Sequence, residues 1–209
     1  MEILQSLLQV FSEISGSGKP VIINSRGDFF SQGYDSSCKL IRDSEFVGNI
    51  IAIGTAVMQL IRNHNGVVLT YATGHAWGAA LELGLVSDAF ISGDKCDFAY
   101  PDASFGLPSI FIDPVTMKEN LGERMFSRLL SGEIINSSDA LSSGITSGRG
   151  NFQKAIDVAI KLNNATFLSA KEGENIDQSR IRNHIRYARS MDTSKIDLKG
   201  LESHRSSFL

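Results

Sequence analysis

Apolar residues recur at helical spacing in two long stretches of the chain, over about residues 2–14 and 45–63. Short β-branched runs predict buried strands at "PVIINS", "VVLTYAT", "DAFISG" and "FAYPD", the last ending at Pro101-Asp102. Further helices are expected over about residues 76–87, 115–131, 151–170 and 177–190, with a short one at "SSDALSSGITS". Strands that alternate with helices and then give way to helices predict an α/β fold.

Composition narrows the class of protein. With 209 residues, 42% hydrophobic and 21% charged, the chain is typical of one soluble globular domain, or of one such domain with a small appendage. A net charge of −3 does not indicate binding to nucleic acid or to an anionic membrane. No apolar run approaches the roughly 18 residues of a membrane span. Cys38 and Cys96 lie far apart without metal-ligand spacing, so we expect reduced thiols, a cytoplasmic protein and no metal site.

One local exception to this charge balance is "RIRNHIRYARS" at residues 180–190. Its apolar residues keep helical spacing, which predicts an amphipathic helix with a solvated basic side. Contact between Arg182, Arg186 and Arg189 and an RNA or another anionic ligand is the alternative, and it rests on this helix alone.

The stretch "GHAWGAALE", residues 74–82, is the first candidate for chemistry. Its small residues would let a ligand approach the first turn of the predicted helix. The backbone N–H groups there lack intrahelical partners and carry the positive end of the helix dipole, so they can hold an oxyanion. Tight packing of the helix on a sheet explains the same small residues equally well.

Glu82 is the unusual residue of this stretch, because its neighbours are apolar. It lies three positions after Ala79, hence on roughly the same face of the helix. If the carboxylate is removed from water, its pKa rises toward the range that a general acid or base needs. An ordinary Glu on an exposed helix stripe fits the periodicity equally well, and the two interpretations stay open.

Two further segments carry polar residues next to predicted strands. "FFSQGYD" places Gly33, Tyr34 and Asp35 in a loop, and Asp102 follows Pro101 at the end of a strand. Loops at strand ends often carry function, although an ordinary loop and a helix-capping Asp are the commoner explanations. Joined by one helix and two strands, Glu82 and Asp102 could converge on one cleft.

The order and spacing of these segments resemble the crotonase superfamily of enoyl-CoA hydratases and isomerases. The similar segments are "GKPVIINSRGDFFSQGYD", "GVVLTYATGHAWGAALELGLVSDAFIS", "CDFAYPDASFGLPS" and "SRLLSGEIINSSDALSSGITS", which together span about residues 18–148. The resemblance implies a spiral of ββα turns over residues 1–148, followed by a helical region over residues 149–209 that builds homotrimers or dimers of trimers. It also implies a divergent member that lacks the family's usual N-terminal strands.

The resemblance implies roles for particular residues. The N–H groups of Tyr34 and Ala79 would bind the thioester oxygen, Glu82 and Asp102 would be the catalytic acid/base pair, and the remaining contacts to substrate or CoA would come from Gly33, Asp35, Lys39 and Gly78. Asp102 stands where the family usually has Glu, which withdraws the carboxylate by roughly 1 to 1.5 Å. Coenzyme A would arrive with the acyl-CoA substrate, so no separate cofactor is expected.

The reaction expected first is hydration of a 2-enoyl-CoA, as a step of fatty acid metabolism, because both acidic positions are filled. One alternative is isomerisation of a 3-enoyl-CoA with Asp102 as the proton shuttle. Another is a homologue that binds acyl-CoA or serves as a structural subunit with little catalysis. The Gly78-Ala79-Ala80 run, which has alanines where the family usually has glycines, favours the last of these.

Overall fold

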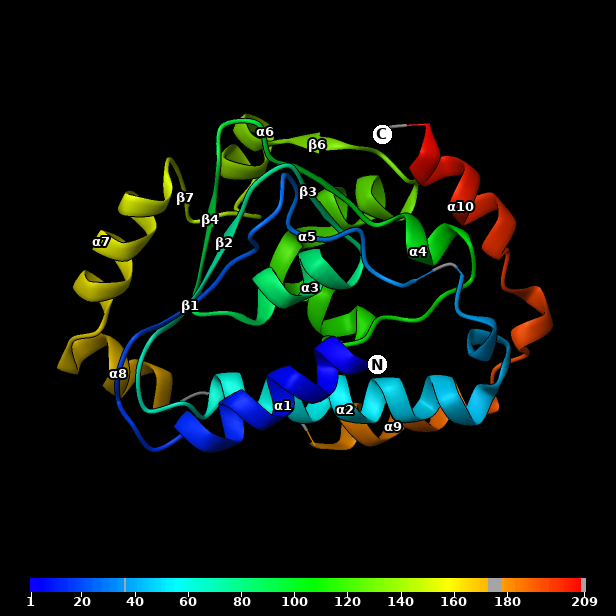
Figure 1. Ribbon diagram of the computed structural model, residues 1–209, viewed down its shortest axis with the longest axis horizontal. Coiled ribbons are helices and arrows are strands. Elements are labelled where there is room, and N and C mark those ends of the chain that lie inside the picture. Colours follow the sequence, from blue (N-terminus) through cyan, green and yellow to red (C-terminus); the bar gives the residue numbers. More distant parts are fainter. Residues whose placement is uncertain (36, 173–177, 208–209) are drawn as a thin grey trace.

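The structure is a computed structural model that describes residues 1–209 except residues 36, 173–177 and 208–209 (Figure 1). Its strands are β1 (Val21–Ile23), β2 (Val68–Ala72), β3 (His75–Trp77), β4 (Ala89–Ser92), β5 (Asp97–Ala99), β6 (Ile135–Asn136) and β7 (Gly148–Arg149). Its α-helices are α1 (Glu2–Ile14), α2 (Ser44–Arg62), α3 (Ala79–Val86), α4 (Pro101–Ser104), α5 (Pro114–Leu130), α6 (Ser137–Ser142), α7 (Phe152–Leu162), α8 (Ala165–Glu172), α9 (Gln178–Ser190) and α10 (Leu198–Ser206). Two 3₁₀ turns, η1 (Lys39–Arg42) and η2 (Thr193–Lys195), complete the described elements.

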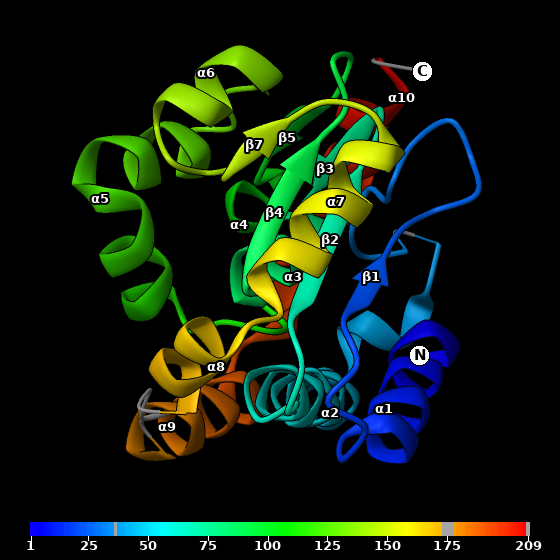
Figure 2. The ribbon, with the colours of Figure 1, turned by 90° about the vertical axis from the view of Figure 1, so that its left-hand side faces the viewer.

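The strands form two small sheets. The first has the order β1-β2-β4-β7 with all neighbours parallel, and the second has the order β3-β5-β6 with β3 and β5 parallel. Helices α3 and α7 cover opposite faces of the first sheet (Figure 2). A parallel sheet that is covered on both faces needs strands that are largely apolar and buried along their length, and β2 and β4 supply them. The α/β prediction is confirmed.

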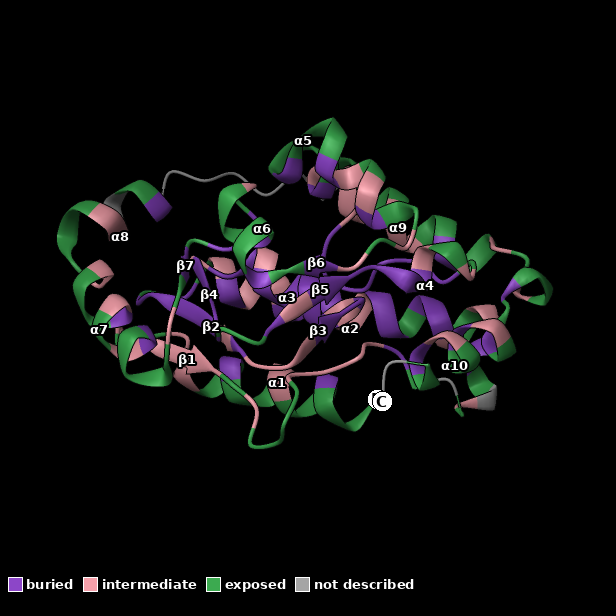
Figure 3. Ribbon diagram, turned by 90° about the horizontal axis from the view of Figure 1, so that it is seen from above, coloured by how far each residue is buried: buried purple, intermediate pink, exposed green. Residues whose placement is uncertain are grey.

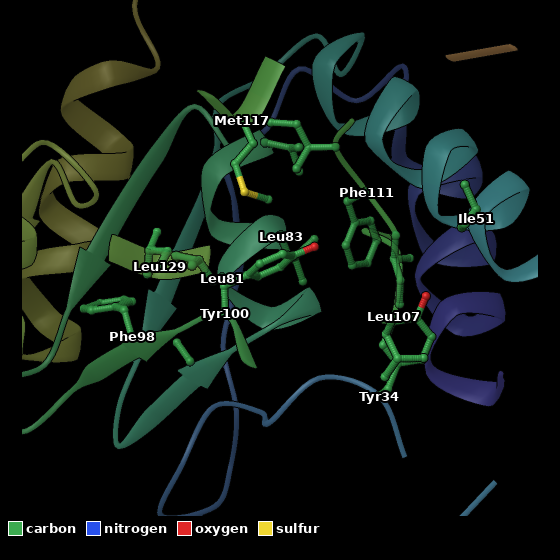
Figure 4. Close-up of a cluster of buried hydrophobic side chains, with 14 of the residues drawn as sticks. Tyr34, Ile51, Leu81, Leu83, Phe98, Tyr100, Leu107, Phe111, Met117 and Leu129 are labelled. Atoms are coloured by element: carbon green, nitrogen blue, oxygen red, sulfur yellow. The ribbon is translucent and has the colours of Figure 1, made fainter. Parts of the chain in front are cut away.

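Helix α3 lies at the centre of the molecule. Nearly all of its residues are buried, and the buried band in Figure 3 runs through α3 and the strands around it. Because every residue of the helix except Glu82 is apolar or Gly, its sequence has no continuous polar stripe from which a solvent face could be predicted. Around it lie side chains from distant parts of the chain (Figure 4), among them Tyr34, Ile51, Phe98, Tyr100, Leu107, Phe111, Met117 and Leu129.

Helices α1, α2 and α9 form a layer along one side of the molecule (Figure 1). Helix α2 begins where the Asp43 carboxylate accepts hydrogen bonds from Glu45 N and Phe46 N. Among the described residues, α2 is long and apolar enough to cross a membrane by length and composition alone. The expectation that no apolar stretch approaches that length was therefore wrong. In the structure α2 packs between α1 and α9, with the stem of Arg189 lying against Gly48.

The structure corrects several predicted boundaries. The helix expected from about residue 76 begins only at Ala79, because residues 75–77 pair with β5 as strand β3. Asp102 lies in the short helix α4 instead of at a strand end. The single helix expected over residues 151–170 is divided into α7 and α8. Asn163 stands at the break, where its side chain accepts a hydrogen bond from Val67 N.

Helices α8 and α10 contact earlier parts of the same chain. Lys171 of α8 is buried, and its ammonium donates to Asp88 Oδ2 at 2.7 Å and to the Gly66 carbonyl at 2.9 Å. The final polar stretch forms α10 against α4 of the same chain (Figures 1 and 3). The division into residues 1–148 and 149–209 stays a prediction.

Candidate active site

The segment around Gly33 is held beside the start of α3 by backbone pairing. Phe30 N and Ser31 N both donate to the His75 carbonyl at 3.0 Å, and Trp77 N donates to the Ser31 carbonyl at 3.0 Å. As a result, a Cβ atom placed on Gly33 would lie only 3.2 Å from Ala79 N. The loop that carries Tyr34 and the first turn of α3 are therefore neighbours, as the resemblance implied.

Gly78 permits the second close approach. It precedes α3 with φ of 56° and ψ of −124°, a backbone conformation that residues other than glycine rarely adopt. A Cβ atom at this position would lie 1.5 Å from Asp102 Oδ2, which means that the Asp102 carboxylate occupies the space beside Gly78. The same oxygen lies 2.9 Å from a Cβ atom placed on Gly33. Two glycines thus make a narrow space for one carboxylate oxygen.

Glu82 is buried with 1% of its surface exposed, which settles the choice that its sequence context left open. Its Oε2 atom accepts hydrogen bonds from Ile110 N and Phe111 N at 2.7 Å and from Ile112 N at 3.4 Å. Its Oε1 atom accepts one from the Tyr100 hydroxyl at 2.8 Å. The Glu82 carboxylate therefore fixes the loop that precedes α5. A catalytic role for Glu82 stays a prediction.

Asp102 is equally buried but is only half satisfied. Its Oδ1 atom accepts a hydrogen bond from Arg205 Nη2 at 2.7 Å. Among the described residues, its Oδ2 atom has no hydrogen-bond partner, although it is shielded from solvent. This oxygen is the one that faces Gly33 and Gly78. A buried acceptor without a partner is costly in a folded protein, and such atoms often serve a ligand or a proton transfer.

The surroundings of the two carboxyl groups raise their pKa values. Burial raises the pKa of Glu82 to about 7, although hydrogen bonds from Phe111 N, Tyr100 and Ile110 N oppose this effect. Burial raises the pKa of Asp102 to about 6, against the opposing charge of Arg205. Both values lie close to neutral pH, where a carboxyl group can exchange protons in either direction.

The other predicted residues of the first loop differ in their exposure to solvent. The Tyr34 side chain is buried, and its hydroxyl donates to the Pro108 carbonyl at 2.9 Å. Asp35 is exposed, and hydrogen bonds from the Ser37 side chain and N–H lower its pKa. Lys39 begins η1, but its side chain lies outside the described part of the structure.

A cavity of about 380 Å³ lies between α4, α5 and α9, and neither Glu82 nor Asp102 is among the residues that line it. Its walls are mostly apolar, with Leu107, Met117 and Phe126 among them, and Tyr100 and Ala103 connect it to the neighbours of Asp102. Its polar feature is the pair formed by His184 and Ser109, in which His184 Nε2 lies 2.9 Å from the Ser109 carbonyl. An apolar cavity with few polar groups suits an acyl chain.

Three components of the site were missed in the sequence. Arg205 was missed because it lies in a polar tail without a recognisable pattern. Tyr100 was missed as a partner of Glu82, and so were the loop N–H groups of residues 110–112. The apolar run "SIFI" at residues 109–112, followed by Asp-Pro, is the one signal that could have indicated a buried loop. Within the described residues, no cluster of His, Cys, Asp and Glu is arranged to hold a metal ion.

Comparison with known proteins agrees with the resemblance seen in the sequence. The family model for enoyl-CoA hydratase/isomerase matches residues 1–171. Solved structures share the fold, as shown by the enoyl-CoA hydratase/isomerase from Mycobacterium paratuberculosis with a TM-score of 0.76 at 20% identity, covering 95% of this chain and 85% of that one. The enoyl-CoA hydratase from Thermoplasma volcanium GSS1 has a TM-score of 0.75 at 19% identity, covering 98% and 86%.

Curated relatives match over a shorter range. The mitochondrial enoyl-CoA hydratase domain-containing protein 3 of Mus musculus is 29% identical over 136 residues, which cover 62% of this chain and 43% of that protein. The Homo sapiens protein of the same name is 28% identical over 135 residues with the same coverage. The match thus spans less than half the length of these relatives. The chain has the crotonase fold and belongs to the enoyl-CoA hydratase/isomerase family.

Proposed function

We propose that this chain is an acyl-CoA enzyme that transfers a proton next to a thioester, with Asp102 as the acid/base. The observation that carries the proposal is the buried Asp102 Oδ2 atom, which has no partner among the described residues and faces the two glycines beside Ala79. The other buried carboxylate, Glu82, already accepts four hydrogen bonds. One available carboxylate oxygen suits a reaction in which one group both removes and returns a proton.

In the proposed site the thioester oxygen lies between the N–H groups of Tyr34 and Ala79. The support for this placement is the close approach of Gly33 to Ala79 N at the start of α3. The N–H groups of a first helical turn have no intrahelical partners and stabilise the negative charge that develops on an enolate oxygen. Because they are fixed before the reaction begins, they stabilise the transition state more than the substrate.

The proposed reaction is isomerisation of a 3-enoyl-CoA. The Asp102 carboxylate takes a proton from carbon 2, so that a C–H bond breaks, an O–H bond forms and negative charge moves onto the thioester oxygen. The protonated Asp102 then returns a proton to carbon 4 while the double bond moves between carbons 2 and 3. With a pKa of about 6, Asp102 is mostly ionised at neutral pH and ready to act as the base.

Hydration of a 2-enoyl-CoA is the second candidate, and one observation favours it. The pKa of Glu82 is raised to about 7, so this group can give and take protons near neutral pH. For hydration, Glu82 Oε1, which accepts only the Tyr100 hydroxyl among the described residues, would have to receive a water molecule as well. Isomerisation needs no such second contact.

Turnover of a 3-enoyl-CoA and of crotonyl-CoA by the purified protein tests the proposal. We expect conversion of the 3-enoyl substrate to the conjugated 2-enoyl product, with slower hydration of crotonyl-CoA. Asp102→Asn is the matched control, because it removes the proton-accepting group at nearly constant volume. Hydration without isomerisation would favour the second candidate, and calorimetric binding of an acyl-CoA without turnover would indicate a binding protein.

The helical C-terminal region was expected to build a homotrimer or a dimer of trimers. That assembly is part of the proposal, and light scattering coupled to size-exclusion chromatography tests it. A mass of one chain at micromolar concentration would contradict it.

A further inference from the structure

Arg205 enters the site from the far end of the chain. It lies in the last turn of α10, 103 residues after Asp102 and outside residues 1–171 that match the family model. Its Nη2 atom donates to Asp102 Oδ1 at 2.7 Å, and its Nη1 atom donates to the Tyr34 carbonyl. Only 6% of its surface is exposed, so this is a buried contact between three distant segments.

The position of the guanidinium is set by how α10 is attached to the core. Asp197 N donates to the Phe105 carbonyl at 2.9 Å, next to α4, and the Asp197 carboxylate caps α10 by accepting from Gly200 N at 2.9 Å. Leu201, one turn before Arg205, is fully buried. The helix is thus held at both its start and its inner face, and Arg205 reaches the site from a fixed base.

This geometry determines which Asp102 oxygen faces the glycines. Because Arg205 holds Oδ1, the other oxygen points toward Gly33 and Gly78, at 2.9 Å and 1.5 Å from the Cβ atoms that these glycines lack. Arg205 Nη2 itself would lie 3.2 Å from a Cβ on Gly33. The Nη1 atom of Arg205 donates to the Tyr34 carbonyl, so the same guanidinium also binds the first loop. One side chain therefore aligns the carboxylate with the loop.

Titratable groups from four segments of the chain interact with Asp102. These groups are Glu82 from α3, Tyr34 from the first loop, Tyr100 just before α4, and Arg205 from α10. Of these four, Arg205 alone is a cation, and it lowers the pKa of Asp102 against the effect of burial. Asp35 also interacts with Arg205, but it is exposed.

We propose that Arg205 is a positioning residue that keeps the Asp102 carboxylate ionised and turns its Oδ2 atom toward the space between Gly33 and Gly78. Its catalytic meaning rests on the proposed function, in which Asp102 is the acid/base. A purely structural role, in which Arg205 only fastens α10 to the core, predicts lower stability in its variants but an unchanged titration of Asp102.

The test follows the Asp102 carboxyl by ¹³C NMR of protein labelled at the aspartate carboxyl carbons, with Asp102→Asn identifying the signal. In Arg205→Gln we expect the titration midpoint to rise by about 1 to 3 units, the usual effect of removing an adjacent arginine. Arg205→Lys keeps the charge and should restore a midpoint close to that of the wild type. Lys199→Gln, an exposed residue of the same helix, is the matched control and should change nothing.

The acid limb of kcat/KM on the 3-enoyl-CoA should move upward with the NMR midpoint in Arg205→Gln. If that variant does not fold, Arg205→Met provides a second neutral side chain of similar reach. A midpoint that stays at the wild-type value in a folded neutral variant would overturn the inference, and so would an equal rise in Arg205→Lys. If the wild type turns over neither thioester, the proposed function fails, while the NMR titration still decides what Arg205 does to Asp102.

Discussion

Glu82 and Asp102 are both 1% exposed, yet their surroundings differ in kind. Glu82 accepts hydrogen bonds from three backbone N–H groups and one hydroxyl, so its carboxylate joins α3 to the loop before α5 and to Tyr100. Asp102 has one oxygen on Arg205 and one facing two glycines. Burial and a raised pKa are therefore features that the two carboxyl groups share. The number and kind of hydrogen-bond donors around each oxygen are what distinguish them.

The largest expected effect comes from removing the Asp102 acid. Asp102→Asn should lower kcat on the preferred thioester by about 10² to 10⁴, the usual contribution of a general acid/base. Glu82→Gln should lower it far less, because a glutamine oxygen can still accept the loop N–H groups. Steady-state kinetics of both variants below their melting temperatures compares them directly. Equal losses in the two variants would mean that both carboxyl groups take part in the reaction.

For stability, in contrast to kcat, we expect the larger loss on removing the carboxylate of Glu82. Glu82→Ala leaves the N–H groups of Ile110 and Phe111 buried without an acceptor, and each such group costs about 1 to 3 kcal/mol. We expect the free energy of unfolding to fall by about 4 kcal/mol, measured by denaturant titration, with a smaller loss in Glu82→Gln. A Glu82→Ala variant as stable as the wild type would show that the loop does not depend on this carboxylate.

The sequence predicted α1, α2 and the strands β1, β2, β4 and β5, but it missed β3, α4 and α10 and did not predict this difference between the carboxylates. The amphipathic patterns of α1 and α2 defined their extents well, since each has one apolar face. Helix α3 is buried all round, so periodicity left the environment of Glu82 open. Its backbone partners lie 28 to 30 residues later in a loop, and Arg205 lies 103 residues after Asp102. Contacts over such separations depend on tertiary packing, which local patterns do not encode.

The pH dependence of stability should separate Glu82 from the rest of the protein. Its pKa is raised by burial from 4.5 to about 7, so the folded state binds the proton more tightly than the unfolded state. The stability that this proton contributes is therefore fully present below about pH 4.5 and is lost as the pH rises through about 7. The loss should be on the order of 3 kcal/mol.

Unfolding free energies of the wild type and Glu82→Gln, measured across that range, isolate this contribution. Their difference should change steadily with pH, because glutamine does not titrate. Asp102, whose pKa is raised to about 6, contributes a slope of the same sign that both proteins share. A difference independent of pH would mean that the folded state does not raise the pKa of Glu82.

The smallest effect should be on substrate choice. Glu82 holds the N–H groups of residues 110–112, and the preceding residues Leu107 to Ser109 line the cavity between α4, α5 and α9. Replacing the carboxylate by an amide in Glu82→Gln weakens about one hydrogen bond, worth about 1 kcal/mol. We therefore expect the ratio of kcat/KM for a long-chain to a short-chain acyl-CoA to change by about fivefold, while Asp102→Asn lowers both values and leaves the ratio unchanged. If the ratio changed in Asp102→Asn but not in Glu82→Gln, Asp102 and not Glu82 would control the cavity, and the prediction would be contradicted.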